Sequence, residues 1–331
     1  MYEHYYGLRE RPFSLTSNPR YLLLTTAHAE ALSTLQYGIR NRAGIIVLIG
    51  EAGTGKTTVL RAAMASQSAD GPFVLLNNPL LTRNEFFEQL VRGFGLSEEA
   101  ATSKARFLSE LTRQLEDSLR SGSQTALIVD EAHALPHEIL EEIRLLANIE
   151  TDDEKLLPVV LAGQPELGDR LNGASLRQLK QRVALRCSLG PLQIKETAAL
   201  IAGRIGVAGG DAAKLFTPKA VELIHELSHG VPRTIGVICD NALLTGFAAD
   251  RRPIGRETVL EVCRDLDLRV PDPAPVPPPL IKEEPFVGRG TGETAGWPRG
   301  TAGPESDSLD RKVVAQVGRF RGFSSWSRGT T

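Results

Sequence analysis

Apolar residues in the first two thirds of the chain alternate between short continuous runs and longer amphipathic stretches. Continuous runs of strand length are typical of strands buried on both faces, and they occur at 45–49, 73–76, 126–129 and 159–162. Between these runs, apolar residues recur with the spacing of an amphipathic helix, at 57–66, 83–93, 104–121 and 136–148. This alternation predicts an α/β fold in which helices cover both faces of a parallel sheet.

The pattern changes twice towards the C-terminus. Between 194 and 268 only helical periodicities remain, over 196–205, 219–228 and 234–248. We therefore expect an α/β domain over 1–193, with an N-terminal segment and first helix at 1–43, and a smaller helical lid subdomain over 194–268. From 269 to 331 we expect a Pro-rich linker, which begins its proline run at Pro271, and a disordered tail, because prolines and few aliphatic residues leave little to bury. Within the tail, 309–321 has helical spacing and is a candidate to fold on a partner.

Composition narrows the functional classes. Of 331 residues, 41% are apolar, and 38 Lys and Arg almost balance 40 Asp and Glu, so any nucleic-acid or membrane partner would need a local patch. Cys187, Cys239 and Cys263 are far apart and odd in number, which argues against a disulfide framework and for a reducing compartment. The chain has neither an N-terminal signal pattern nor an apolar run of about 18 residues, so we expect a cytoplasmic protein with no transmembrane segment.

A glycine-rich loop directly follows the first apolar run. Its spacing is G-x-x-x-x-G-K-[ST], and a helix is predicted to begin within it. Such a loop wraps phosphates with its N–H groups, while its lysine reaches the β and γ phosphates of ATP and its first threonine binds Mg²⁺. The alternative is an ordinary strand-to-helix turn. It is disfavoured because the sequence matches all four fixed positions of the motif, and because a strand is predicted before the loop and a helix after it. The loop comprises Gly50, Glu51, Ala52, Gly53, Thr54, Gly55, Lys56, Thr57 and Thr58.

Two acidic residues follow the third apolar run. Asp130 and Glu131 stand at the carboxyl end of a predicted strand, where open α/β sheets place their ligand crevice. Asp130 is expected to hold Mg²⁺, and Glu131 to orient or deprotonate the attacking water. Alone, the pair is equally consistent with a solvated turn or a helix cap before Pro136. The string Asp-Glu-Ala-His is similar to one found in helicases, but a second motor domain does not fit before the prolines.

Three further polar positions are candidates for the same site. Gln164 follows the fourth run and either contacts the γ-phosphate or water, or caps the turn before Pro165. The basic segment 176–186 is expected to be helical with one cationic face; it is either solvated or supplies a phosphate-clamping arginine, with Arg182 first and Arg177 second. Arg233 begins a predicted helix, where a cation opposes the helix dipole, so it either serves a bound anion or reaches solvent.

Further segments accompany the two nucleotide motifs. They are Tyr5-Tyr6-Gly7-Leu8-Arg9-Glu10-Arg11-Pro12-Phe13-Ser14-Leu15, Asn18-Pro19-Arg20-Tyr21, Leu35-Gln36-Tyr37-Gly38-Ile39, Gly163-Gln164-Pro165-Glu166-Leu167 and Leu176-Arg177-Gln178-Leu179. Together these motifs resemble the ExeA (general secretion pathway protein A) group of bacterial AAA+ ATPases, which is similar to the TniB and MuB transposition ATPases. The resemblance covers roughly 1–268 and implies that Gln164 is sensor 1, Arg182 the arginine finger and Arg233 sensor 2. It also implies a homo-oligomer with ATP at subunit boundaries.

Three functions follow as hypotheses. The first is an ATPase that couples turnover to oligomerisation and to remodelling of a protein partner, in a secretion or envelope polysaccharide system. The second is an ATP-dependent DNA-binding protein of the transposition type, which would need a local basic patch. The third, a scaffold with an inactive site, is disfavoured because Lys56, Asp130 and Glu131 are all in place. The longer design of the secretion group adds a membrane span and a peptidoglycan-binding domain, which this chain does not offer, so direct action on the cell wall is not expected.

Overall fold

The computed structural model of the chain describes residues 1–14, 19–21, 25–66, 71–77 and 80–268. Several predictions concern segments outside these ranges. The proline-rich linker, the tail and the candidate helix at 309–321 lie outside the described residues, as do Leu15 and Asn18 of the N-terminal motifs.

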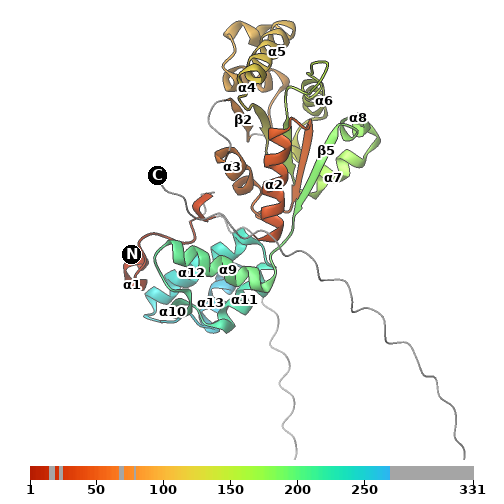
Figure 1. Cartoon of the computed structure of the whole chain (residues 1–331). Helices are drawn as coiled ribbons and strands as arrows, with labels where there is room; N and C mark the ends of the chain where they lie inside the picture. Colours follow the sequence, from red (N-terminus) through yellow and green to blue (C-terminus); the bar gives the residue numbers. More distant parts are fainter. Residues whose placement is uncertain (15–18, 22–24, 67–70, 78–79, 269–331) are drawn as a thin grey trace, which may run out of the picture. The chain divides into compact units, whose positions relative to one another are not determined.

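Five parallel strands form one sheet in the order β2-β3-β4-β1-β5 (Figure 1). The strands β1, β3 and β4 are buried along their whole length, because each has neighbours on both edges and helices on both faces. This arrangement confirms the predicted α/β fold class. The strands are β1 Ile45–Gly50, β2 Phe73–Leu76, β3 Ala126–Val129, β4 Val159–Gly163 and β5 Val183–Leu189.

Alternate residues of the central strands enter two different cores. Ile45 and Val47 pack with one set of helices, whereas Ile46 and Leu48 pack with the other, as the two-residue period of a strand requires. The helices α2 Thr26–Arg40 and α3 Lys56–Ala65 cover one face. The other face is covered by α4 Arg83–Phe94, α5 Lys104–Ser121, α6 His137–Leu146 and α7 Pro165–Asn172. Short 3₁₀ turns stand at η1 Pro19–Tyr21, η2 Glu98–Thr102, η3 Ala132–Ala134 and η4 Ala174–Leu176.

The predicted helix with a cationic face at 176–186 is wrong. The segment forms the short helix α8 Arg177–Lys180 and then enters the edge strand β5. Side chains of β5 alternate between half-buried and exposed, with Arg186 on the exposed side, so its true period is two. An edge strand with one covered face tolerates charges that a central strand would not. The spacing of the basic residues therefore hid the apolar alternation from Val183 to Leu189.

After β5 the described chain is helical, and its helices group together (Figure 1). Their apolar side chains form a core separate from the two that flank the sheet. Residues Met1–Asp272 nevertheless make one compact unit. The helices of this helical part are α9 Ile194–Val207, α10 Ala212–Leu215, α11 Pro218–Ser228, α12 Pro232–Ala248 and α13 Arg256–Asp265.

The N-terminal segment packs on the helical part, although its place in the chain assigned it to the α/β domain. Tyr6 and Phe13, which belong to helix α1 Tyr2–Tyr6 and the residues after it, are buried in the helical core. The Tyr5 hydroxyl donates a hydrogen bond to Asp250 at 2.7 Å. Because these side chains are aromatic, a few residues bury enough area to anchor a short segment.

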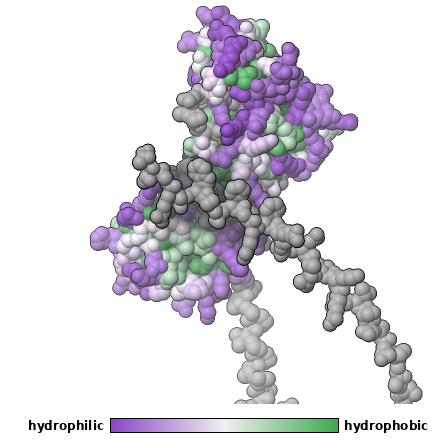
Figure 2. All heavy atoms as spheres, viewed as in Figure 1, coloured by the Kyte–Doolittle hydropathy of each residue, from purple (hydrophilic) through white to green (hydrophobic). Residues whose placement is uncertain are grey.

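Hydrophilic residues dominate the visible face of the part that holds the sheet (purple in Figure 2). Among the described residues, Glu142 is one of the charged side chains that are buried. Glu142 of α6 accepts hydrogen bonds from Arg83 at 2.6 Å and from Lys104 at 2.7 Å, the first residues of α4 and α5. Burial alone would raise the pKa of Glu142, but the bonds from Lys104 and Arg83 outweigh it and hold the pKa below its usual range.

Glu142→Gln should therefore destabilise the fold at neutral pH. Replacing the carboxylate weakens three charge-assisted hydrogen bonds, two from Arg83 and one from Lys104. Since both cations remain partly solvated, we expect a loss of about 1–2 kcal/mol in unfolding free energy. A carboxylate with a lowered pKa stabilises the fold above its unfolded pKa and loses this effect as the pH falls through the folded value. Urea unfolding across pH 3–7 measures this, with the exposed Glu138→Gln as control. A difference that does not shrink on acidification would contradict the assignment.

Candidate functional site

The loop after β1 closes around the Lys56 ammonium. Gly53 and Gly55 take positive φ angles of 81° and 103°, which side chains other than glycine rarely adopt. Lys56 is buried, and its Nζ donates to the carbonyls of Gly50 at 2.7 Å and of Glu51 at 3.1 Å. Because α3 begins at Lys56, the unpaired N–H groups of its first turn belong to the same loop.

The loop meets the end of β3 through a hydroxyl and a carboxylate. Thr57 Oγ1 donates to Asp130 Oδ2 at 2.6 Å, and the backbone N–H of Glu131 donates to Asp130 Oδ1 at 3.0 Å. Asp130 is buried, so its carboxylate is held in one orientation. The pair thus places two hard oxygen ligands beside the loop, which suits Mg²⁺.

Glu131 is linked to Gln164 through His133. Glu131 takes a left-handed conformation at φ 53°, and its Oε2 lies 3.4 Å from His133 Nδ1. The Gln164 side-chain amide lies 3.2 Å from His133 Nε2, and the Gln164 backbone N–H donates to His133 Nδ1 at 3.4 Å. The imidazole therefore connects the acidic residue after β3 with the amide after β4. In the sequence, His133 stands out only as the last residue of the helicase-like motif Asp-Glu-Ala-His.

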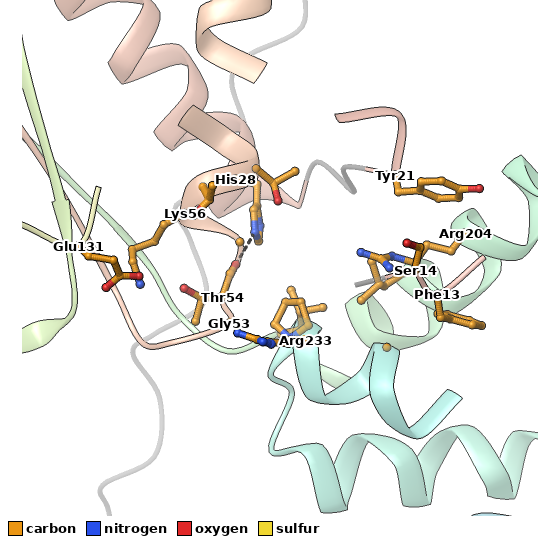
Figure 3. A pocket seen from close by; sticks show the side chains of 17 residues that line it. Phe13, Ser14, Tyr21, His28, Gly53, Thr54, Lys56, Glu131, Arg204 and Arg233 are labelled. Carbon is orange, nitrogen blue, oxygen red and sulfur yellow. Dashed lines mark hydrogen bonds between the residues drawn. The ribbon is translucent and has the colours of Figure 1, made fainter. Parts of the chain in front are cut away.

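A cavity of about 270 Å³ lies next to the loop (Figure 3). Its wall combines the N-terminal segment, the loop, Glu131 and the helices α9 and α12. Asp130 stands behind Thr57 and is not part of the wall. The lining residues are Phe13, Ser14, Tyr21, His28, Gly53, Thr54, Gly55, Lys56, Thr57, Thr58, Glu131, Leu192, Leu200, Arg204, Pro232, Arg233 and Gly236.

The helical part contributes two arginines to the cavity. Arg233, in the first turn of α12, donates its backbone N–H to the Gly53 carbonyl at 3.2 Å, and its side chain lies beside the loop (Figure 3). Arg204 of α9 lies over the Tyr21 ring, 5.8 Å from its centroid. Burial lowers the pKa of Arg204, and its Nε is buried without a hydrogen-bond partner among the described residues. Such a cation suits an anionic or acceptor-rich ligand.

Arg182 lies at the opposite end of the sheet from the loop. Its carbonyl accepts from the N–H of Ile45, at the start of β1, whereas the loop begins at the other end of this strand. Five residues of strand separate the two ends, or roughly 16 Å. Within one copy of the chain, the exposed Arg182 therefore takes no part in the cavity.

Comparison with known proteins agrees with this geometry. Residues 39–171 match a family model described as an AAA domain. The chain contains an AAA domain. General secretion pathway protein A of Aeromonas hydrophila is 40% identical over 248 residues, which are 75% of this chain and 45% of that protein. The chain thus spans less than half the length of this relative. The resemblance predicted from the motifs is confirmed for the matched region.

Solved structures share the fold of the AAA domain and the helical part. The Aeropyrum pernix ORC2 protein, in its ADPNP–ADP complexes, superposes with a TM-score of 0.59 at 14% identity, over 77% of this chain and 71% of that one. Cdc6p of Pyrobaculum aerophilum gives a TM-score of 0.60 at 17% identity, over 77% and 70%. At such identities the likeness shows the P-loop NTPase fold alone. No helix among the described residues is long and apolar enough to cross a membrane.

The site residues predicted from the sequence fall into three groups. Lys56, Asp130 and Glu131 come together at the loop with Gly53 to Thr58, and Gln164 joins them through His133. Arg233 approaches from the helical part, while Arg182 stays apart. Their catalytic roles stay predictions. His28 and Arg204 could not be predicted, because a single buried or half-buried polar residue on an amphipathic helix has no local signature in the sequence.

The close approach of α12 to the loop predicts the effect of Gly53→Ala. A Cβ at Gly53 would lie 2.8 Å from Arg233 Cβ, in addition to the strain of a positive φ. At Gly95, with φ 70°, a Cβ meets nothing within 4 Å, so Gly95→Ala reports the backbone strain alone. We expect Gly53→Ala to cost at least about 1 kcal/mol more unfolding free energy than Gly95→Ala. If both variants lose the same unfolding free energy in denaturant, α12 does not pack closely enough against the loop to clash with an added Cβ.

Proposed function

We propose that this chain binds ATP with Mg²⁺ in the cavity and hydrolyses it to ADP and phosphate. AAA domains are ATPase domains as a class, and one observation carries the proposal for this chain. The Thr57 hydroxyl lies 2.6 Å from the Asp130 carboxylate, with the Lys56 ammonium in the same loop. Glu131 stands on the adjoining cavity wall. Each residue type that phosphoryl transfer requires is thus present at one place.

Main-chain groups would bind the phosphates. Glycine at 53 and 55 allows the loop to turn its N–H groups inward, and α3 directs its positive end at the same point. The Lys56 ammonium now donates to two loop carbonyls, and it would donate to phosphate oxygens in the complex. Arg233 would add a second cation from the helical part.

The residues present also fit Mg²⁺. Thr57 and Asp130 offer oxygen ligands, and Mg²⁺ usually takes only one or two protein ligands together with phosphates and water. Consistent with this, the described residues contain no group of three or more His, Cys, Asp or Glu that could hold a metal by itself. When bound, the ion would neutralise phosphate charge and orient the terminal phosphoryl group.

Glu131 and Gln164 would act on the attacking water. The water oxygen forms a bond to the terminal phosphorus, the bond from that phosphorus to the bridging oxygen breaks, and the water proton passes to the Glu131 carboxylate. Gln164, the N-cap residue that precedes α7 and lies next to His133, would hold the water or the terminal phosphate with its amide. ADP keeps the bridging oxygen as its terminal phosphate oxygen.

Turnover would require neighbouring copies of the chain. Arg182 lies too far from the loop of its own copy, but it is exposed at the edge of the sheet. We infer that it reaches the nucleotide of an adjacent subunit as an arginine finger. A homo-oligomer with ATP between subunits follows, and hydrolysis would then change the assembly.

The biological role proposed is remodelling of a protein partner in a secretion or envelope polysaccharide system. The support is the relationship to general secretion pathway protein A over 248 residues. We place the reaction in the cytoplasm, where ATP is available. Cys187, Cys239 and Cys263 are all free thiols, which is consistent with that compartment.

A second candidate function is nucleotide-dependent DNA binding. The observation in its favour is a run of exposed cations at Arg177, Lys180, Arg182 and Arg186. Duplex DNA would raise ATP turnover, in a strongly salt-dependent way, if this function held. Turnover that does not respond to DNA supports the remodelling function.

Two variants test ATP hydrolysis at the loop. Glu131→Gln should keep the wild-type Kd for ATP within about threefold and lower kcat by a factor of about 10²–10⁴, because only the proton acceptor is lost. Lys56→Met should lose detectable ATP binding. Nucleotide titration and phosphate release measure both, and the exposed Glu138→Gln serves as control. Wild-type turnover by Glu131→Gln would contradict the assignment.

Mixed oligomers test the position of Arg182. Arg182→Ala and Glu131→Gln should each be inactive alone, since a finger arginine contributes roughly 10³–10⁵ in kcat. Mixed together they should recover turnover, because an intact site of the first can face an intact arginine of the second. The matched control mixes Arg182→Ala with the double variant Glu131→Gln, Arg182→Ala, which should recover nothing. Absence of recovery in the first mixture would contradict the transfer of Arg182 across a subunit boundary, and full activity of Arg182→Ala alone would place Arg182 outside the site.

A further inference from the structure

A buried histidine joins the N-terminal segment to the phosphate loop. His28 lies in the first turn of α2 and is 4% exposed. Its Nε2 is 3.0 Å from the Thr54 carbonyl oxygen, and its Nδ1 is 2.7 Å from the hydroxyl of Thr25, the residue that caps the helix. Figure 3 shows the imidazole beside the cavity with its bond to Thr54 drawn.

The partners determine where the ring proton sits. A carbonyl oxygen can only accept, so His28 Nε2 must carry the proton and donate it to Thr54. Nδ1 forms a hydrogen bond with the Thr25 hydroxyl. The same hydroxyl oxygen accepts the backbone N–H of His28 at 3.3 Å. Both ring nitrogens are thus used, and the imidazole is held in a single orientation.

This contact determines the direction of a loop N–H. The Thr54–Gly55 peptide is planar, so its carbonyl and its N–H point in opposite directions. With the Thr54 oxygen held by His28, the N–H of Gly55 must point away from the imidazole. The absence of a side chain at Gly55 also allows the imidazole to lie close to the loop, because a Cβ at Gly55 would be only 3.1 Å from His28 Nε2.

We propose that His28 is a positioning residue for the phosphate site: it holds the Thr54–Gly55 peptide so that the Gly55 N–H faces the phosphates of the bound nucleotide. The inference rests on the proposed ATP binding. Gly53 and Gly55 both have wide conformational freedom. The peptide before Thr54 is held by the Arg233 N–H on the Gly53 carbonyl and by the Thr54 N–H on the Glu51 carbonyl, whereas the peptide after Thr54 is held by His28. His28 thus contributes to phosphate affinity without touching the phosphates.

The test compares His28→Leu, which has similar bulk and no donor, with His28→Gln, whose amide can donate in place of Nε2. We expect His28→Leu to raise the KM and Kd for ATP about tenfold, with kcat within about twofold, because one phosphate contact is misaligned. His28→Gln should recover most of the affinity, which a role in packing alone would not explain. His137→Leu, on the exposed surface of α6, is the matched control.

Amide hydrogen exchange of the loop, measured without nucleotide, separates the two proposals. It should be faster than wild type in His28→Leu and near wild type in His28→Gln. If His28→Leu does not fold, Thr25→Val, compared with Thr25→Ser, removes the hydroxyl bond to Nδ1 and should shift Kd and exchange in the same direction. Wild-type Kd and exchange in the donor-less variants would overturn the inference. Failure of wild-type protein to bind ATP would instead overturn the proposed function.

Discussion

The hydrogen bond between Thr57 and Asp130 connects the two parts of the sequence that the site requires. Asp130 ends one strand and Thr57 lies in the loop after another, and the strand β4 separates them in the sheet. Their distance therefore depends on the register of three strands at once. Because each central strand is buried on both faces, a shift of one residue would expose apolar side chains, and the cores hold the register in place.

The remaining walls of the cavity come from outside the sheet. Aromatic residues anchor the N-terminal segment on the helical part, and the same segment leads through Thr25 and His28 to the loop. Arg233 brings the helical part to Gly53 from another direction. A ligand in the cavity would touch the loop after β1, the helical part and the N-terminal segment together.

Most of the fold could be predicted from sequence because its central strands are continuous apolar runs. The strands at 73–76 and 126–129 agree with the structure to the residue. The loop and the acidic pair were equally visible, since their spacing is local. β5 was missed because an edge strand carries charges on its exposed face, and here these charges also had helical spacing. His28 and Arg204 could not be found, because their importance arises from partners far away in sequence.

The proposed function requires a nucleoside triphosphate on the N–H groups of the loop, with its metal at Thr57. The decisive measurement is a crystal structure with a non-hydrolysable ATP analogue and Mg²⁺. We expect phosphate oxygens on the amides from Gly53 to Thr58 and the metal bound to Thr57 Oγ1. Nucleotide bound away from the loop, or a metal bound without Thr57, would contradict it.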